Sequence, residues 1–169
     1  ESIEKGKNTS NLRTSYFGNV WSSDIVHQSS PILVYDMQDA DVLREGLNIG
    51  LYSEVHPINL EKAQFMIYYW PIGSYIPWHN DNHAALTATL YCNKFWDIDW
   101  GGLFVYEEKN KKSVEVPEWN KLVVQTEKEW HSTTSVTRPY YYPEISINGK
   151  VEIGSTIRTT LQIFVPDEK

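Results

Sequence analysis

The sequence has a single cysteine, few positive charges and no long apolar segment. Cys92 alone can form neither an internal disulfide nor a cysteine-based zinc cluster. No apolar run approaches the roughly 18 residues that a membrane-spanning helix needs, so we expect no membrane contact. Lysine and arginine total 15 against 22 acidic residues, which gives a formal net charge of −7. An acidic chain repels a phosphate backbone, and this disfavours nucleic-acid binding.

Several catalytic signatures are missing as well. There is no Gly-x-Ser-x-Gly turn for a serine hydrolase and no glycine-rich phosphate loop for a nucleotide enzyme. Apolar residues at 41% and charged residues at 22% are ordinary globular values, and 169 residues suit one domain with a single core. Because the sequence begins at Glu1 and not at methionine, we expect a trimmed or processed chain. A cytoplasmic location is the default expectation, and the oligomeric state is left open.

Aromatic residues are abundant, at 14% of the chain, and they favour strands and ligand-binding faces. We expect Trp100, Phe104 and Trp119 to pack the core. From residue 63 onwards, short apolar segments alternate with turn signals, and eight strands are expected at 63–70, 75–79, 85–92, 102–107, 113–116, 121–126, 131–136 and 157–165. Eight short strands at this spacing predict a closed barrel or a jelly roll.

The segment before residue 63 differs in its composition and in the spacing of its apolar residues. Residues 1–30 are polar and are expected to form an N-terminal arm, and 31–35 are expected to form a short strand. Apolar residues recur at helical spacing after Asp39, which predicts a helix over 39–51. The predicted fold is therefore mainly β (α+β), a single domain in which this helix packs outside the β-rich core.

His79 and Asp81 are two residues apart in a predicted extended segment, so their side chains point to the same face. His131 begins another predicted strand, 52 residues further along the chain. Two histidines and one carboxylate are the ligand set of the facial triad in non-haem Fe(II) oxygenases. A surface histidine beside a turn aspartate would give the same His-x-Asp pattern. His83 continues the spacing, either as a fourth ligand or, as we favour, as a solvent or substrate contact.

Arg158 lies in a predicted strand whose alternate residues include Thr160. An arginine that points into an apolar barrel is costly unless a carboxylate meets it. Its planar set of N–H donors, beside a hydroxyl, suits a dicarboxylic co-substrate. If Arg158 instead points outward, the pattern does not indicate a binding site.

Taken in order, these segments resemble the Fe(II)- and 2-oxoglutarate-dependent oxygenases, in the prolyl 4-hydroxylase-like branch. The resemblance covers roughly residues 63–165, and its matching segments are 69–73, 75–81, 86–93, 100–103, 116–117, 121–123, 130–131 and 158–160. It implies a double-stranded β-helix, a jelly-roll and cupin-like core, over 63–165. It also implies Fe(II), 2-oxoglutarate and O2 as cofactor and co-substrates, with ascorbate as an optional addition. No catalytic residue beyond the metal centre is implied.

The resemblance also assigns residues. It implies that Fe(II) is held by His79, Asp81 and His131. It implies that 2-oxoglutarate contacts Arg158, Tyr91, Thr160 and Tyr69, with Tyr68 as the register alternative to Tyr69.

One departure from the family concerns the basic residue, which usually follows the second histidine by about ten positions. Here the gap from His131 to Arg158 is 27 residues, so 137–153 is expected to be an inserted loop or hairpin. Arg138 is the rival anchor. We favour Arg158 because Arg138 precedes a proline in a turn-rich stretch, whereas Arg158 begins a regular strand alternation.

The implied activity is hydroxylation of an unactivated C–H bond with release of succinate and CO2. A peptidyl proline is the leading substrate, and another side chain, a free amino acid or a small metabolite is the alternative. Tyr140, Tyr141 and Tyr142 on the insertion, together with His83, are the expected substrate contacts. Two rival classes stay open: a β-sandwich carbohydrate-binding module, and a cupin-like metalloenzyme that uses another metal and no co-substrate.

Overall fold

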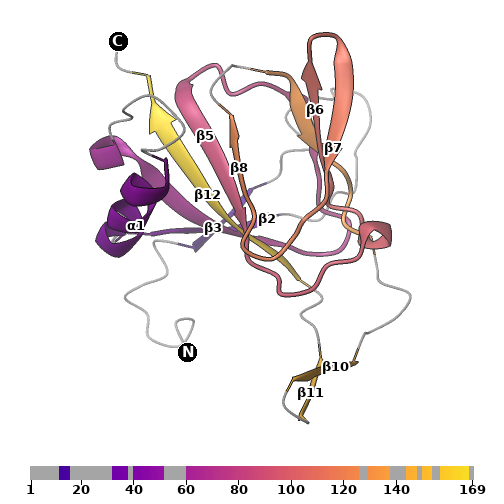
Figure 1. Cartoon of the computed structure of the whole chain (residues 1–169). Coiled ribbons are helices and arrows are strands. Elements are labelled where there is room, and N and C mark those ends of the chain that lie inside the picture. The colour runs from indigo at the N-terminus through magenta and orange to yellow at the C-terminus, as the bar shows by residue number, and fades with distance from the viewer. Residues whose placement is uncertain are drawn as a thin grey trace.

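Two antiparallel sheets that face each other form the body of the protein in the computed structural model (Figure 1). The structure describes residues 12–15, 32–37, 40–51, 60–125, 129–137, 144–147, 150–153 and 157–167. The larger sheet has the strand order β1 (Leu12–Ser15), β2 (Ile32–Asp36), β3 (Gln64–Trp70), β12 (Arg158–Pro166), β5 (Ala84–Tyr91) and β8 (Leu122–Gln125). The smaller sheet has the order β4 (Ile76–His79), β9 (His131–Thr133), β6 (Phe104–Glu108) and β7 (Lys111–Glu115).

Helical structure is sparse among the described residues. It comprises α1 (Asp41–Leu51) and two 3-10 turns, η3 (Leu60–Lys62) and η4 (Ile98–Trp100). Helix α1 lies against the outer face of the larger sheet, beside β3 and β12 (Figure 1). The mainly β fold, a double-stranded β-helix with a helix outside, is therefore confirmed. None of the helices in the described part of the chain is both long enough and apolar enough to span a membrane.

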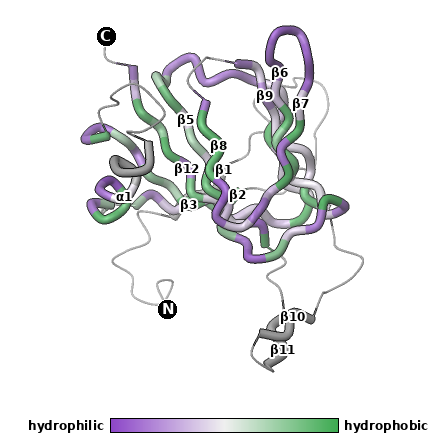
Figure 2. Tube along the Cα trace, viewed as in Figure 1, coloured by the Kyte–Doolittle hydropathy of each residue, from purple (hydrophilic) through white to green (hydrophobic). Residues whose placement is uncertain are grey.

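Strand β12 separates the core from the cavity because its alternate residues face opposite ways. Leu161, Ile163 and Val165 pack in the buried core on the side of α1, where Ile163 is fully buried. Gln162 and Phe164 instead line a cavity between the two sheets. Figure 2 shows the hydrophobic residues along β12, β5 and β8, and the hydrophilic residues at the turn that joins β6 to β7.

The register around β12 brings distant aromatic side chains together. This strand lies between β3 and β5, with Arg158 paired to Trp70 on β3. Thr160 is paired both to Tyr68 on β3 and to Tyr91 on β5. Residues separated by about 70 to 90 positions in sequence thus meet at one end of the larger sheet.

The aromatic residues expected in the core have different outcomes. Trp100 and Phe104 are buried as expected. The expectation that Trp119 packs the core is wrong, because it lies in the loop between β7 and β8 with 56% of its surface exposed.

The predicted insertion 137–153 contains two strands, β10 (Glu144–Ile147) and β11 (Lys150–Ile153), which pair only with each other. Figure 1 shows this hairpin apart from both sheets, beyond the end of β12 at which Arg158 lies.

We expect Ile163→Ala to lower the free energy of unfolding by about 2–5 kcal/mol, because it leaves a cavity in the closed core behind β12. Val42→Ala is the matched control, since Val42 on α1 is 84% exposed; it should change stability by less than about 0.5 kcal/mol. Urea denaturation of both variants measures the difference. Equal effects would contradict this description of the core.

Candidate active site

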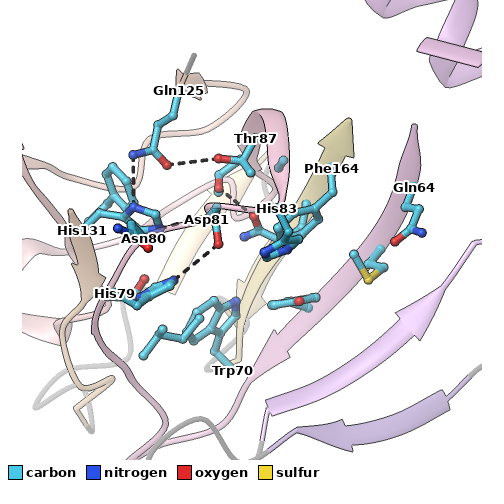
Figure 3. A pocket seen from close by; sticks show the side chains of 18 of the residues that line it. Gln64, Trp70, His79, Asn80, Asp81, His83, Thr87, Gln125, His131 and Phe164 are labelled. Atoms are coloured by element: carbon cyan, nitrogen blue, oxygen red, sulfur yellow. Dashed lines mark hydrogen bonds and ion pairs between the residues drawn. The ribbon is translucent and has the colours of Figure 1, made fainter. Parts of the chain in front are cut away.

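His79, Asp81 and His131 converge between the two sheets. His79 ends β4 and is paired in register with His131, the first residue of β9. Asp81 follows in the adjoining turn, with Oδ1 3.8 Å from His79 Nε2 and Oδ2 3.5 Å from His131 Nε2 (Figure 3). One ligand atom from each residue lies within 4.8 Å of the others. The strand pairing therefore assembles the three residues that sequence spacing had singled out.

Backbone carbonyls fix which nitrogen of each histidine is free. His79 Nδ1 lies 2.7 Å from the carbonyl oxygen of Pro77, and His131 Nδ1 lies 2.9 Å from that of Glu129. A carbonyl oxygen can only accept, so each Nδ1 carries the proton and donates it. Both Nε2 lone pairs are then directed towards Asp81, which is the tautomer that a metal ion requires.

The protonation state of His131 also suits a metal. Burial lowers the pKa of His131 below its usual value, and the nearby His79 lowers it further. The hydrogen bond to the Glu129 carbonyl and the charge of Asp81 oppose this shift. A neutral imidazole is the form that binds a divalent cation.

His83 does not join the cluster. Its ring stacks on Phe164 with 6.3 Å between ring centroids, at the edge of the cavity. Among the described residues, no other histidine, cysteine or acidic side chain joins the cluster of His79, Asp81 and His131. Three protein ligands on one side of an ion would leave its remaining positions open for small molecules.

Arg158 lines the same cavity as the cluster and is 1% exposed. Its Cζ atom is 4.4 Å from the centre of the Trp70 ring and 5.4 Å from that of Tyr91. Nε and Nη1 have no hydrogen-bond partner among the described residues. Burial lowers the pKa of Arg158 to about 10, with Tyr91 opposing the shift, so the guanidinium is charged at neutral pH.

A buried cation without a counter-ion is strongly unfavourable. The Tyr91 hydroxyl beside it is also buried and has no partner in the described part of the chain. Burial raises the pKa of Tyr91, although the charge of Arg158 opposes this, so the phenol keeps its proton and can donate it. Together these orphaned donors form a site for an anionic oxygen, and a carboxylate meets both requirements.

Gly102 shapes the arginine pocket from the side of the smaller sheet. Its φ is +63°, and a Cβ atom there would lie 2.6 Å from Arg158 Cδ and 3.0 Å from Nε. A side chain at this position would displace the arginine and strain the backbone. The absence of a side chain at Gly102 thus helps to set the position of the guanidinium.

The cavity joins these two groups in one space of about 580 Å³. Arg158 and Trp70, the His79–Asp81–His131 cluster, and His83 and Phe164 all line it. Figure 3 shows the two cluster histidines on one side of this space, His83 and Phe164 on the other, and Trp70 below them. The remaining lining residues are mostly apolar or uncharged polar ones: Gln64, Met66, Tyr68, Ile76, Asn80, Ala84, Thr87, Thr89, Phe104, Gln125, Thr133, Gln162 and Pro166.

The expectation for Tyr69 needs correction. Residues of β3 alternate, and it is Tyr68 and Trp70 that line the cavity, so Tyr69 belongs to the opposite face. The register alternative, Tyr68, is the residue in the site. Thr160 is fully buried and accepts hydrogen bonds from Trp70 Nε1 at 2.9 Å and Gln162 Nε2 at 3.1 Å.

Sequence reasoning missed Trp70, Gln162 and Gln125. Period-two alternation from Tyr68 and from Thr160 would have found the first two. Gln125 lies at the end of β8, with its amide nitrogen 3.3 Å from His131 Nδ1, and no spacing rule links those strands. Tyr140, Tyr141, Tyr142 and Arg138 lie outside the described residues, so their roles stay predictions.

The model of the 2OG-Fe(II) oxygenase superfamily matches residues 63–149, and the chain belongs to this superfamily. No curated protein matches the chain.

Solved structures with a similar fold include a prolyl-4-hydroxylase from Pseudomonas putida, with 16% identity over 91% of this chain and 78% of the other, and a TM-score of 0.56. A prolyl hydroxylase from Trichoplax adhaerens, in complex with a hypoxia inducible factor oxygen degradation domain peptide, has 14% identity over 94% and 72% of the two chains, and a TM-score of 0.63. A 2OG-Fe(II) oxygenase family oxidoreductase from Burkholderia pseudomallei has 14% identity over 90% and 70%, and a TM-score of 0.57. At these identities, the likeness concerns the fold.

We expect Gly102→Ala to weaken 2-oxoglutarate binding by about tenfold or more, because it displaces a charge-assisted contact. Metal affinity should be unchanged, since Gly102 does not contact the metal cluster. Calorimetric titration of each ligand measures both. The control is Gly46→Ala on α1, where an added Cβ has no neighbour within 4 Å. Parallel loss of both affinities would indicate general misfolding and contradict a local role.

Proposed function

We propose that this protein is an Fe(II)- and 2-oxoglutarate-dependent dioxygenase that hydroxylates a peptidyl proline and releases succinate and CO2. The observation that carries the proposal is one cavity that contains both a His-Asp-His cluster and a buried arginine whose Nε and Nη1 have no hydrogen-bond partner among the described residues. A metal centre without an anion site would suit many reactions. The combination is specific for a metal-bound co-substrate with a free carboxylate.

The residues present fit both groups. His79, Asp81 and His131 would hold the iron through two imidazole Nε2 atoms and a carboxylate. Arg158 would receive the distal carboxylate of 2-oxoglutarate. When bound, iron and 2-oxoglutarate together supply the oxidising power for inserting one oxygen atom into an unactivated C–H bond.

The chain's own contribution is positioning. Thr160 already accepts two hydrogen bonds, so its hydroxyl proton is available to donate to a carboxylate at Arg158. Trp70 is held by its bond to Thr160 and covers one face of the guanidinium. Tyr68 and Trp70 are buried and would exclude water from the anchored end of the co-substrate.

The lining of the cavity favours a peptidyl substrate over a free amino acid. A free amino acid carries an ammonium and a carboxylate, and both need a counter-charge when they leave water. Apart from the metal cluster and Arg158, the described lining residues include no Asp, Glu, Lys or Arg. A residue inside a peptide presents neutral amides instead, which Gln64, Gln125 and Gln162 can bind.

The two rival classes of protein explain fewer features of the site. A carbohydrate-binding module needs neither the metal cluster nor a buried arginine, and a cupin-like enzyme without a co-substrate leaves Arg158 without a role. Ascorbate as a further cofactor, and the tyrosines at 140–142 as substrate contacts, stay predictions.

We expect His79→Ala, His131→Ala and Asp81→Asn each to abolish turnover and to weaken Fe(II) binding. Asp81→Asn keeps the shape and removes the charge, so it tests the electrostatic part of the ligand set. Equilibrium dialysis against Fe(II), with succinate release as the second readout, measures both effects. Full activity in the His131 variant would refute the assignment.

We expect Arg158→Ala to raise the KM for 2-oxoglutarate about 10- to 1000-fold, since a charge-assisted pair in a dry pocket is worth about 2–4 kcal/mol. Arg138→Ala serves as the control and should leave this KM nearly unchanged. Fluorescence titration of 2-oxoglutarate onto each metal-loaded variant gives an independent affinity. The reverse pattern would make Arg138 the anchor.

A further inference from the structure

A second hollow of about 430 Å³ lies beside the metal cavity, between β8 and the hairpin of β6 and β7. We call it the β8 groove. Its lining residues are Phe104, Tyr106, Glu108, Glu115, Lys121, Leu122, Val123, Val124, Gln125 and Glu129. Every residue of β8 contributes to it, which means that the groove follows the backbone of this strand and not one of its faces. Figure 1 shows β8 at the side of the larger sheet that faces β6 and β7.

The groove side of β8 is an open strand edge. Strand β8 is the last of the larger sheet, and among the described strands it pairs with β5 and no other. The Tyr91 N–H donates to the Lys121 carbonyl at 3.0 Å, so in an antiparallel ladder Val123 and Gln125 also bond to β5. The N–H and C=O groups of Leu122 and Val124 then point away from β5. No strand in the described residues pairs with them.

The groove is continuous with the metal cavity. Phe104 and Gln125 line both spaces. The Gln125 amide nitrogen is 3.3 Å from His131 Nδ1, so the last residue of β8 lies directly behind a proposed metal ligand. At about 3.3 Å per residue, a strand added along β8 would place a residue near the metal and its neighbours along the groove.

The groove is also acidic. Among the lining residues that the structure describes, three carry a carboxylate, Glu108, Glu115 and Glu129, and one carries an ammonium, Lys121. Lys121 Nζ is 2.7 Å from Glu115 Oε2, an ion pair between the start of β8 and β7. Glu108 Oε1 is 3.4 Å from Nζ of Lys109, which is not one of the described lining residues. The excess of carboxylates among the described lining residues favours a cationic occupant.

We propose that the substrate is an extended, basic peptide that binds as an additional strand along the open edge of β8. Its backbone pairs with Leu122 and Val124. Its target residue passes Gln125 to reach the metal, and a lysine or arginine within about four residues of the target contacts the carboxylates of the groove. This proposal rests on the proposed function and names the substrate class of the same site.

The first test uses wild-type protein and peptides that share one central proline and differ in flanking lysine, alanine or glutamate. Binding is measured by fluorescence anisotropy, and turnover by a mass gain of one oxygen. We expect lysine-flanked peptides to bind about 3- to 10-fold more tightly than alanine-flanked ones, an advantage that high salt removes. Turnover that ignores the flanking charge would overturn the proposal and leave the proposed function standing. Binding with this preference but without turnover would refute the proposed function alone.

The second test uses two charge reversals on one strand. Glu108→Lys should weaken binding of the lysine-flanked peptide by about tenfold. Glu107→Lys is the matched control, because Glu107 is adjacent on β6 but does not line the groove, and it should leave binding unchanged. Equal effects of the two variants would mean that overall charge, and not the groove, attracts the peptide.

The third test addresses the strand edge itself. Val124→Pro removes an N–H that points into the groove and not one that pairs with β5, and we expect about a tenfold loss of peptide affinity with 2-oxoglutarate affinity retained. If that variant does not fold, peptides N-methylated at alternate residues test the same bonds on wild-type protein, and one of the two methylation registers should lose binding. Equal binding of both registers would overturn strand addition. Concentration-dependent dimerisation that Val124→Pro abolishes would show that the edge serves a second copy of the chain instead.

Discussion

The burial of Arg158 without a counter-charge among the described residues is the constraint on which the rest of the site depends. A guanidinium with 1% exposure is tolerable only if its surroundings hold it and if an anion completes it. Trp70 and Tyr91 supply two aromatic faces, and Gly102 supplies a backbone without a side chain on the third side. Arg158, whose Nε and Nη1 have no partner among the described residues, lines the cavity that the metal cluster also lines. The unpaired charge of Arg158 destabilises the protein without a ligand, and binding of an anion offsets this loss.

The same strand that begins with this arginine also organises the hydrophobic core. On β12, Leu161 and Ile163 face the apolar layer under α1, while Gln162 and Phe164 face the cavity. Fixing the core therefore fixes the direction of every second side chain in the site. A register slip of one residue would exchange the two sets, moving polar groups into the core, so the core protects the geometry of the site.

Much of this could be predicted because the signals are local. His79 and Asp81 are two residues apart, and the alternation after Arg158 runs through a whole strand, so both follow from period-two geometry. The error at Tyr69 arose at a strand end, where a motif count from His79 crosses the Pro71–Gly73 turn and does not fix the face. Gln125 and the open edge of β8 could not be predicted at all. They depend on which strands become neighbours, and that is decided by the packing of the two sheets rather than by any segment alone. The prediction that Trp119 packs in the core was wrong for another reason. Composition does not indicate whether a large aromatic side chain lies in a strand or in a loop.

The position of β12 has a consequence for how the protein is made. Among the described strands it is the last in the chain, yet it lies in the middle of the larger sheet, between β3 and β5. During synthesis, β3 and β5 each have one unpaired edge until β12 is available. Much of the apolar surface under α1 is uncovered during that time. Chains whose central pairings join such distant segments fold slowly and are open to aggregation in the meantime. The larger sheet can therefore close around its centre only after β12 has left the ribosome.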